Sequence, residues 1–461
     1  MDKIYIPDFI DIDGGRPLAE GAAVHISGAK NEVLGAMSAA VLTDKPVVFN
    51  NVPFVTDVLD MCEILRGIGV SVDYDPARRR VAIHAKKIAS NILPPAALNL
   101  RASYYIWGAL LARFVKTGEW KSLKLQKPGG CGFTDISGDH RKFDYHENLI
   151  RNVLGATLVE AADNYEFVLP PKFVPAARPI FHTPLISHGA TFHWMLTAAL
   201  LPNLEFMYNA AMESEVPHLL GILHRMGAKL RGSNTTAIVN FGFGGKLLDG
   251  GEFDIMPDRM ETGFYALLAM ALKSRIKLIG TDAESCRPWL NSVIEIAGAE
   301  RCQIYGDFMR FDFTDMPDFD GRDFVMSPIP GKETDMHQVW TPILATARTR
   351  SRIYDPIWIG RTGHLPELAK FGIRSESRVV EAHDAGTGET SKLLKSSEIT
   401  IFPSKLHAAE ANGMDLRGTP GLIIAAAMCA GRSRIHNPKF ALRGYPNLVE
   451  NLLRIGINVA Q

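Results

Sequence analysis

A cysteine set among glycines is the first place in this sequence where chemistry can be expected. Cys131 lies in the Lys-Pro-Gly-Gly-Cys-Gly stretch of residues 127–132, and Arg141 follows ten residues later at the head of an Arg-Lys-Phe-Asp-Tyr-His stretch. A thiol in a polar loop, close in sequence to guanidinium, carboxylate and imidazole groups, suits acid-base or covalent chemistry. The cationic side chains favour a substrate that carries phosphate.

The other four cysteines give no comparable signal. They are scattered in apolar or mixed contexts that suit ordinary packing, and none has the close paired spacing of a zinc site. These are Cys62, Cys286, Cys302 and Cys429. No Walker-type phosphate loop is present either. We therefore expect neither a metal ion nor a cofactor.

Composition excludes some partners. The chain has 461 residues, 46% of them hydrophobic, which is enough for two or three domains with real cores. Its formal net charge is zero, so no overall field attracts nucleic acid or anionic membrane. The first residues do not resemble a signal peptide, and no apolar stretch approaches the length of a membrane span. We expect a cytoplasmic protein with neither nucleic-acid nor membrane partners.

A short pattern repeats six times and indicates which elements position these residues. In each copy an amphipathic run ends at a glycine and a strand-like run follows. Glycine at that point suits a helix C-cap, because it adopts positive φ without steric cost. Successive glycines are 71 to 86 residues apart: Gly69, Gly155, Gly227, Gly298, Gly372 and Gly456.

Each copy also has a second element, a polar start followed by a helix that is apolar nearly all round, which predicts a helix buried in a domain interior. This element begins about forty residues before the glycine in most copies. In the second copy the distance is longer, and the additional residues include Cys131. The starts lie at residues 28–31, 101–103, 187–191, 258–262, 334–336 and 415–418. The chain thus reads as six α/β units, three in each of two domains, with a closed barrel or a solenoid as alternatives.

Four of these helix starts carry a cation: Lys30, Arg101, Arg259 and Arg417. A helix N-terminus already has partial positive charge and free N–H groups. Cationic side chains at these helix starts argue against six repeats with a purely structural role. They favour an arrangement in which the four side chains bind one shared anionic ligand. The alternative is that each is an ordinary capping or surface charge.

At these positions the sequence resembles the enolpyruvyl transferases. Each motif alone is weak evidence for the family. The series is specific, because the motifs occur in family order along the chain. They are residues 27–31, 100–103, 128–131, 187–191, 257–263, 334–336, 361 with 364–368, 415–417 and 442–445. The resemblance implies a two-domain inside-out α/β barrel of six repeated α/β units. Residues 27–256 would form the domain with the Cys131 loop, and residues 1–26 plus 257–461 the other.

The resemblance also implies the reaction. The enolpyruvyl group of phosphoenolpyruvate would pass to a hydroxyl of a uridine nucleotide, with release of phosphate. The branch resembled most uses UDP-N-acetylglucosamine, in peptidoglycan synthesis. One alternative is a nucleoside monophosphate acceptor such as UMP, as in nucleoside-antibiotic biosynthesis. A less favoured one is a non-catalytic, nucleotide-binding paralogue, because retention of both acid and base candidates argues for catalysis.

By the same resemblance, Cys131 is the proton donor and the target of the covalent inhibitor fosfomycin. Asp335 takes the proton of the acceptor hydroxyl, although an aspartate there could also merely cap the helix. The catalytic set is Cys131, Asp335, Lys30, Arg417 and Asp415. Phosphoenolpyruvate would contact Lys30, Asn31, Arg141, Arg361, Arg417 and Arg443. The nucleotide would contact Arg101, Arg141, Lys142, Phe143, Asp144, Tyr145, Ser187, His188, Gly189, Asp335 and Ile357.

The sequence departs from the family pattern near the expected acceptor. Cys131 and Arg141 are further apart than in the usual loop, and the added residues include Asp135 and Asp139. His188 replaces a small apolar residue, and Leu185 stands where some members have a phosphate-binding lysine. These changes favour weaker recognition of a diphosphate and a better chance for a monophosphate acceptor.

Overall fold

The computed structural model describes residues 4–126, 144–160, 164–175, 180–183, 186–232, 236–358, 360–382 and 394–461. These fall into two compact units. The first unit is the described part of the chain from Gly28 to Met256, and the second unit comprises residues 4–27 and the described part from Pro257 to the C-terminus. Each unit has its own hydrophobic core.

The predicted repeat is confirmed by six helices that are buried along almost their whole length. They are α1 (Lys30–Ala39), α3 (Tyr104–Thr117), α5 (His188–Ala198), α7 (Arg259–Ala271), α9 (His337–Leu344) and α11 (Gly418–Met428). In the first unit α1, α3 and α5 contact one another, and in the second unit α7, α9 and α11 do the same. The helices without a polar face therefore form the interior of each unit.

Six amphipathic helices end at the predicted glycines. They are α2 (Thr56–Gly67), α4 (Asp144–Leu154), α6 (Glu215–Arg225), α8 (Ala283–Ala297), α10 (His364–Ala369) and α13 (Leu448–Arg454); a further short helix is α12 (Lys439–Leu442). All six glycines of the repeat have positive φ, between 66° and 99°. A strand follows each of them, as the pattern predicts.

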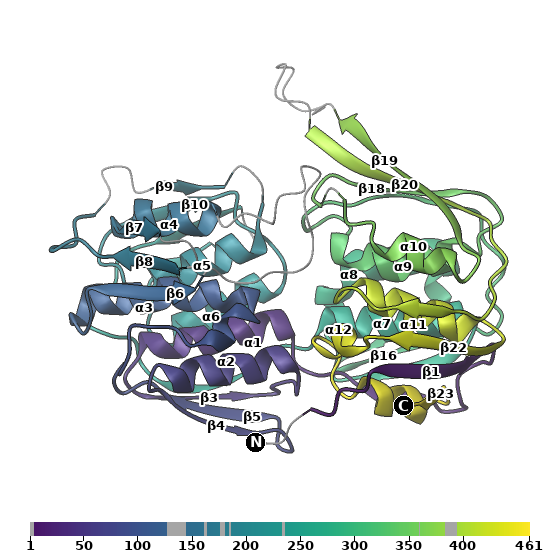
Figure 1. Cartoon of the computed structure of the whole chain (residues 1–461), viewed down its shortest axis with the longest axis horizontal. Coiled ribbons are helices and arrows are strands. Elements are labelled where there is room, and N and C mark those ends of the chain that lie inside the picture. The colour runs from purple at the N-terminus through teal and green to yellow at the C-terminus, as the bar shows by residue number, and fades with distance from the viewer. Residues whose placement is uncertain are drawn as a thin grey trace. The chain divides into compact units, whose positions relative to one another are not determined.

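Three sheets enclose the first unit, in the strand orders β13-β3-β5-β4, β6-β8-β7 and β11-β12-β10-β9. Their strands are β3 (Pro46–Asn50), β4 (Ser71–Asp75), β5 (Arg80–His84), β6 (Ser122–Gln126), β7 (Thr157–Glu160), β8 (Asn164–Val168), β9 (Ile180–His182), β10 (Glu205–Tyr208), β11 (Leu230–Arg231), β12 (Ala237–Asn240) and β13 (Gly251–Asp254). In Figure 1, β3, β5 and β4 lie on one side of the unit's helices, and β9 and β10 lie on the opposite side.

The second unit has the orders β15-β16-β14-β2, β17-β18-β20-β19 and β21-β22-β1-β23. Its strands are β1 (Phe9–Gly14), β2 (Ala23–His25), β14 (Arg275–Ile279), β15 (Cys302–Tyr305), β16 (Phe308–Asp312), β17 (Asp323–Val325), β18 (Ser351–Asp355), β19 (Arg374–Ala382), β20 (Leu394–Phe402), β21 (Glu410–Asn412), β22 (Gly431–His436) and β23 (Asn458–Ala460). Figure 1 shows α7, α9 and α11 between the sheet with β1 and β22 and the sheet with β18 and β20.

Two parallel pairings complete sheets with strands distant in sequence. β2 pairs with β14 in the second unit, and β13 pairs with β3 in the first. The chain passes from β2 of the second unit to α1 of the first, and from β13 of the first unit to α7 of the second. None of the helices that the structure describes has the length and hydrophobicity needed to cross a membrane.

Candidate active-site residues in the two units

Asp335 of the second unit binds two arginines. It lies in a 3₁₀ turn, Thr334–Met336, directly before α9. Arg361 donates from Nη1 to one carboxylate oxygen at 2.7 Å, and Arg417 donates from Nε to the other at 3.1 Å. The side chain of Asp335 is 34% exposed, whereas those of the arginines are 9% and 5% exposed. The N-cap residue of α9 is Met336, which makes no side-chain capping hydrogen bond.

Arg417 is held in place by the backbone turn before α11. Asp415 accepts hydrogen bonds from the amides of Arg417 and Gly418, at 2.7 and 2.8 Å. Its carbonyl oxygen also accepts from the Thr419 hydroxyl at 2.8 Å. Asp415, one of the predicted catalytic residues, therefore orients Arg417 through the main chain.

The electrostatic balance at Asp335 favours the carboxylate form. Desolvation by burial raises the pKa of Asp335, but the charges of Arg361 and Arg417 outweigh it, with a smaller contribution from Arg259. The pKa of Asp335 is therefore held well below its usual range. In the opposite sense, desolvation lowers the pKa of Arg417, but Asp335, with smaller contributions from Tyr445 and Asp258, outweighs it, so that the pKa of Arg417 is raised. Each group keeps the other charged.

A second buried pair lies beside this cluster. Arg259, the first residue of α7, binds Glu333, and both side chains are less than one tenth exposed. Asp258 caps α7 by accepting from the amides of Met260 and Glu261, which fixes the helix start. Arg443, predicted to contact phosphoenolpyruvate, is half-buried directly after α12. The four predicted cations of this unit, Arg259, Arg361, Arg417 and Arg443, are thus buried or half-buried.

Two buried histidines, to which the sequence analysis assigned no role, lie close enough to Arg361 to interact with its charge. His337 opens α9 and His364 opens α10, with ring centroids 5.3 Å apart. Burial holds the pKa of His337 well below its usual value and lowers that of His364 to about 3. Both stand within three residues of a predicted functional residue, Asp335 or Arg361. That adjacency is the sequence signal that could have identified them.

Asp355 shapes the loop that carries Ile357. It is the last residue of β18 and accepts from the amides of Ile357 and Trp358, at 2.9 and 3.1 Å, as well as from the Thr334 hydroxyl. Desolvation by burial raises the pKa of this carboxyl group. Ile357 is half-buried. The same carboxylate thus connects the Ile357 loop with the turn that holds Asp335.

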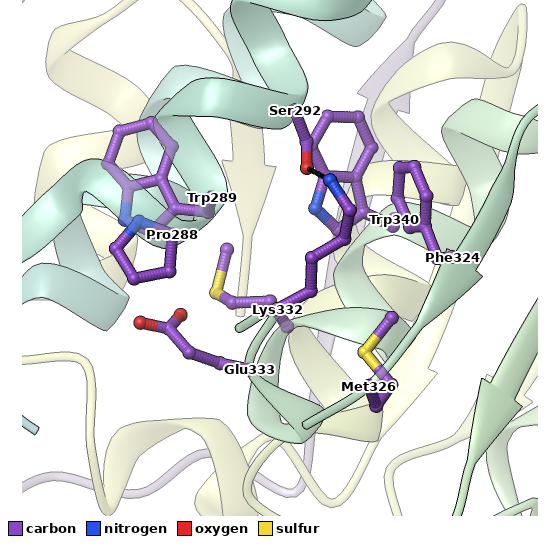
Figure 2. A pocket seen from close by; sticks show the side chains of 9 residues that line it. Pro288, Trp289, Ser292, Phe324, Met326, Lys332, Glu333 and Trp340 are labelled. Carbon is purple, nitrogen blue, oxygen red and sulfur yellow. Dashed lines mark hydrogen bonds between the residues drawn. The ribbon is translucent and has the colours of Figure 1, made fainter. Parts of the chain in front are cut away.

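A small cavity lies next to Glu333, but it cannot hold a substrate. Its volume is about 10 Å³, room for at most one water. Figure 2 shows Trp289, Trp340, Phe324 and Met326 around it, with Lys332 donating to Ser292 at 2.6 Å. Its apolar lining packs behind the turn that carries Asp335 and supports it.

In the first unit, Lys30 pairs with a buried carboxylate. Lys30 opens α1 and donates from Nζ to Asp57 of α2 at 3.0 Å, with side chains 9% and 4% exposed. Asn31 beside it is half-buried. Lys30, Arg259 and Arg417 all have a carboxylate partner within their own unit, so the sequence-based alternative of surface charges is wrong for these three.

The expected nucleotide residues of the first unit lie at the starts of three helices. Arg101 is half-buried in the 3₁₀ turn Arg101–Ser103 before α3, and Tyr145 lies in the first turn of α4. Ser187 caps α5 by accepting from the Ala190 amide at 3.3 Å. His188 packs its ring 4.2 Å from that of Phe192. Its Nε2 is buried without a hydrogen-bond partner in the part of the chain that the structure describes.

Several predicted residues fall outside the described residues: Cys131, Arg141, Lys142, Phe143 and Leu185, together with the side chain of Asp144. The four other cysteines are free thiols. Burial raises the pKa of Cys302 to about 11, raises those of Cys62 and Cys429 to about 12, and raises that of Cys286 further. A raised pKa disfavours the nucleophilic thiolate, so these four suit packing rather than catalysis.

Comparison with known proteins now decides the family. A profile described as EPSP synthase (3-phosphoshikimate 1-carboxyvinyltransferase) matches residues 15–133 and 178–452. The chain belongs to the EPSP synthase family of enolpyruvyl transferases. It is therefore an enzyme of the transferase class, and the resemblance drawn from its motifs is confirmed.

Curated relatives match along the whole chain. The chain is 29% identical over 456 residues to UDP-N-acetylglucosamine 1-carboxyvinyltransferase 2 of Lactococcus lactis subsp. lactis. It is 30% identical over 451 residues to the protein of the same name from Streptococcus mutans serotype c. Each comparison covers 98% of both proteins.

Solved structures confirm the predicted fold class. The enolpyruvyl transferase NikO from Streptomyces tendae superposes with a TM-score of 0.79 at 20% identity, covering 98% of both chains. EPSP synthase from Acinetobacter baumannii gives a TM-score of 0.69 at 15% identity, covering 98% of this chain and 100% of its own. At these identities the likeness concerns the two-domain α/β fold alone.

Proposed function

We propose that the protein transfers the enolpyruvyl group of phosphoenolpyruvate to a hydroxyl of a uridine nucleotide and releases phosphate. The observation that carries this proposal is the cluster of Asp335 with Arg361 and Arg417. It offers two guanidinium groups to a substrate carboxylate, and a carboxylate to an acceptor hydroxyl. The names of the full-length relatives support UDP-N-acetylglucosamine as the acceptor.

The proposed reaction needs a proton donor and a proton acceptor. The acceptor oxygen bonds to C2 of phosphoenolpyruvate while C3 takes up a proton, which gives a tetrahedral intermediate. Loss of a proton from C3 then expels phosphate and restores the double bond. We assign the donation to C3 to Cys131 and the removal of the hydroxyl proton to Asp335. The raised pKa of the four described thiols supports Cys131 as the reactive one.

The ion pairs explain how the base would become active. While Arg361 and Arg417 both hold Asp335, its pKa is low and it is a weak base. A substrate carboxylate that binds the same guanidinium groups competes with Asp335 for their hydrogen bonds. Asp335 then loses part of its stabilisation as an anion, and its pKa rises toward the usual range. Binding of phosphoenolpyruvate would therefore prepare the base for the acceptor.

A monophosphate acceptor such as UMP is the second candidate, and His188 favours it. This imidazole stands at an expected nucleotide-contact position, and its buried Nε2 lacks a partner among the described residues. Buried polar atoms in proteins are nearly always hydrogen-bonded, so a ligand group could satisfy it. The longer spacing from Cys131 to Arg141, with its two added aspartates, points the same way.

The test is phosphate release from phosphoenolpyruvate with UDP-N-acetylglucosamine, with UMP and with no acceptor. We expect release that depends on a uridine nucleotide and is fastest with the diphosphate sugar. Arg417→Ala should raise the KM for phosphoenolpyruvate. Arg432→Ala is the matched control, because Arg432 binds Asp13 in an exposed pair of the same unit and should leave the rate unchanged.

Each contrary outcome has a definite meaning. Faster release with UMP would identify the second acceptor, and shortening the chain by residues 134–138 should then improve use of the diphosphate sugar. Tight nucleotide binding without any release of phosphate would contradict catalysis and favour a nucleotide-binding paralogue.

A further inference from the structure

Three aromatic side chains from three helices meet inside the first unit. Tyr104 opens α3, His146 lies in the first turn of α4, and His193 lies in the middle of α5. The rings of Tyr104 and His146 stack with centroids 3.7 Å apart and planes 21° apart. Nδ1 of His146 lies 3.0 Å from Nδ1 of His193. The three residues are 8%, 6% and 0% exposed. We call this group the histidine joint.

The contact between the two imidazoles is a single, specific hydrogen bond. A neutral imidazole has one N–H donor and one acceptor nitrogen, so one Nδ1 must donate and the other accept. Two protonated rings would place two N–H groups against each other. Burial lowers the pKa of His193 to about 3, so this ring stays neutral near neutral pH. The bond therefore fixes the distance and rotation of α4 against α5.

Close packing between α3 and α5 holds the joint on both sides. A Cβ atom at Gly189 would lie 2.2 Å from the Tyr104 hydroxyl. A Cβ atom at Gly108 would lie 1.9 Å from the Thr197 hydroxyl and 2.6 Å from Nε2 of His193. Only glycine permits this approach at either position. Tyr104 and His193 consequently have little freedom to move relative to each other.

The segments expected to hold the nucleotide adjoin the joint. Arg101 lies three residues before Tyr104, and Tyr145 lies directly before His146. Ser187, His188 and Gly189 form the start of α5, one turn before His193. Three helix starts that are far apart in sequence thus share one buried contact point. A change in that contact would alter their mutual positions.

We propose that the hydrogen bond between His146 and His193, seated on the Tyr104 ring, is a positioning joint for the nucleotide acceptor. The inference rests on the proposed function, because that function assigns the adjoining segments to the nucleotide. The joint would set the acceptor's affinity without taking part in proton transfer. It would not affect Arg361 and Arg417, which belong to the other unit.

The test compares His193→Leu with His193→Asn. Leucine removes the hydrogen bond, whereas the asparagine amide places a hydrogen-bonding atom near the position of Nδ1. We expect His193→Leu to raise the acceptor KM about tenfold, as loss of one buried hydrogen bond would, with the KM for phosphoenolpyruvate changed less than about twofold. His193→Asn should recover most of the acceptor affinity. The double variant His146→Leu/His193→Leu should bind the acceptor no worse than either single variant.

Two further measurements distinguish loss of the hydrogen bond in the histidine joint from a nonspecific effect of substituting a histidine. His84→Leu is the control, since it removes a hydrogen bond from His84 to the Asp44 carbonyl at the surface of the same unit and should change neither KM. Amide hydrogen exchange in α4 from Asn148 onward, where the amides are bonded within the helix, should accelerate in His193→Leu and not in His193→Asn. This readout requires no substrate, so it tests the joint even if the acceptor is not a uridine nucleotide.

The outcomes that overturn the proposal are distinct from failure of the proposed function. Equal losses for both substrates, additive effects in the double variant, or an asparagine variant as impaired as the leucine variant would each contradict the joint. Unchanged hydrogen exchange in His193→Leu would contradict it as well. Absence of nucleotide binding and of phosphate release in the native protein would instead contradict the proposed function.

Discussion

At the scale of single residues, Asp335 forms one hydrogen-bonded network with Arg361 and Arg417, although these residues are assigned different roles in the reaction. The family resemblance predicts Asp335 as a base and Arg361 and Arg417 as contacts of phosphoenolpyruvate. In the structure the aspartate occupies both arginines itself. An anionic substrate must therefore share or replace these contacts. The local charge balance, and not the aspartate alone, determines when the base is active.

Asp335→Asn tests this role. The amide keeps the shape of the carboxylate but cannot accept a proton, so we expect kcat to fall by a factor of about 10² to 10⁴. Phosphoenolpyruvate should bind at least as tightly, because the arginines lose a competing anion. Kinetics and calorimetry would measure the two effects. Loss of acceptor binding with a normal kcat would show instead that Asp335 binds substrate and that the base lies elsewhere.

Cys131 gives the second prediction at this scale. Cys131→Ala should cripple turnover without unfolding the protein, because a thiol in a polar glycine-rich stretch contributes little to a core. Fosfomycin should alkylate this cysteine in preference to the four whose thiol pKa is raised by burial. Peptide mass spectrometry would locate the adduct. Modification confined to another cysteine, or near-native rates for the alanine variant, would be inconsistent with the assignment.

At the scale of elements, the repeat was predictable because it depends on local signals. A glycine at the end of an amphipathic run marks a C-cap wherever it occurs, and all six have positive φ in the structure. Contacts between distant residues were not predictable in this way. Lys30 and Asp57 are 27 residues apart, Arg417 and Asp335 are 82 apart, and the two histidines of the joint are 47 apart. Only the fold brings such pairs together.

Gly108 and Gly221 form a matched pair for a prediction about helix packing. Both lie in helices, but a Cβ atom at Gly108 would collide with Thr197 and His193, whereas one at Gly221 has nothing within 4 Å. Gly108→Ala should destabilise the protein by about 1 to 3 kcal/mol through overpacking. Gly221→Ala should stabilise it by about 0.5 to 1 kcal/mol through helix propensity. Urea denaturation would measure both changes, and equal effects would refute the close approach of α3 and α5.

At the scale of the whole molecule, burial of neutral histidines links stability to pH. The pKa of His193 is lowered to about 3 in the folded protein, below the value of about 6.5 for an exposed histidine. Below pH 6.5 the unfolded chain takes up a proton at this position that the folded chain does not. The contribution of His193 to the free energy of unfolding is thus full above pH 6.5 and is lost as the pH falls toward 3.

His193→Asn isolates this contribution. Over the range from pH 6 to pH 4, the free energy of unfolding of the native protein should fall more steeply than that of the variant. The difference in slope should approach one proton, about 1.4 kcal/mol per pH unit. Denaturation at a series of pH values would measure it. Parallel curves would mean that His193 binds a proton equally in both states.

The family and the fold followed from the sequence, whereas the acceptor depends on the few residues that differ from the family pattern. His188 and the longer spacing from Cys131 to Arg141 are such differences. Their effect on binding depends on the positions of groups around the ligand, which no local pattern specifies. The reaction itself therefore needs a direct test.

The most direct test is to run the reaction in D₂O with phosphoenolpyruvate and each uridine nucleotide, and to analyse the products by NMR and mass spectrometry. We predict phosphate and an enolpyruvyl ether of the nucleotide in equal amounts. Solvent deuterium should appear at C3 of the enolpyruvyl group, because C3 gains a solvent-derived hydron before phosphate leaves. Phosphate without the ether, or an ether without deuterium at C3, would contradict addition and elimination at this site.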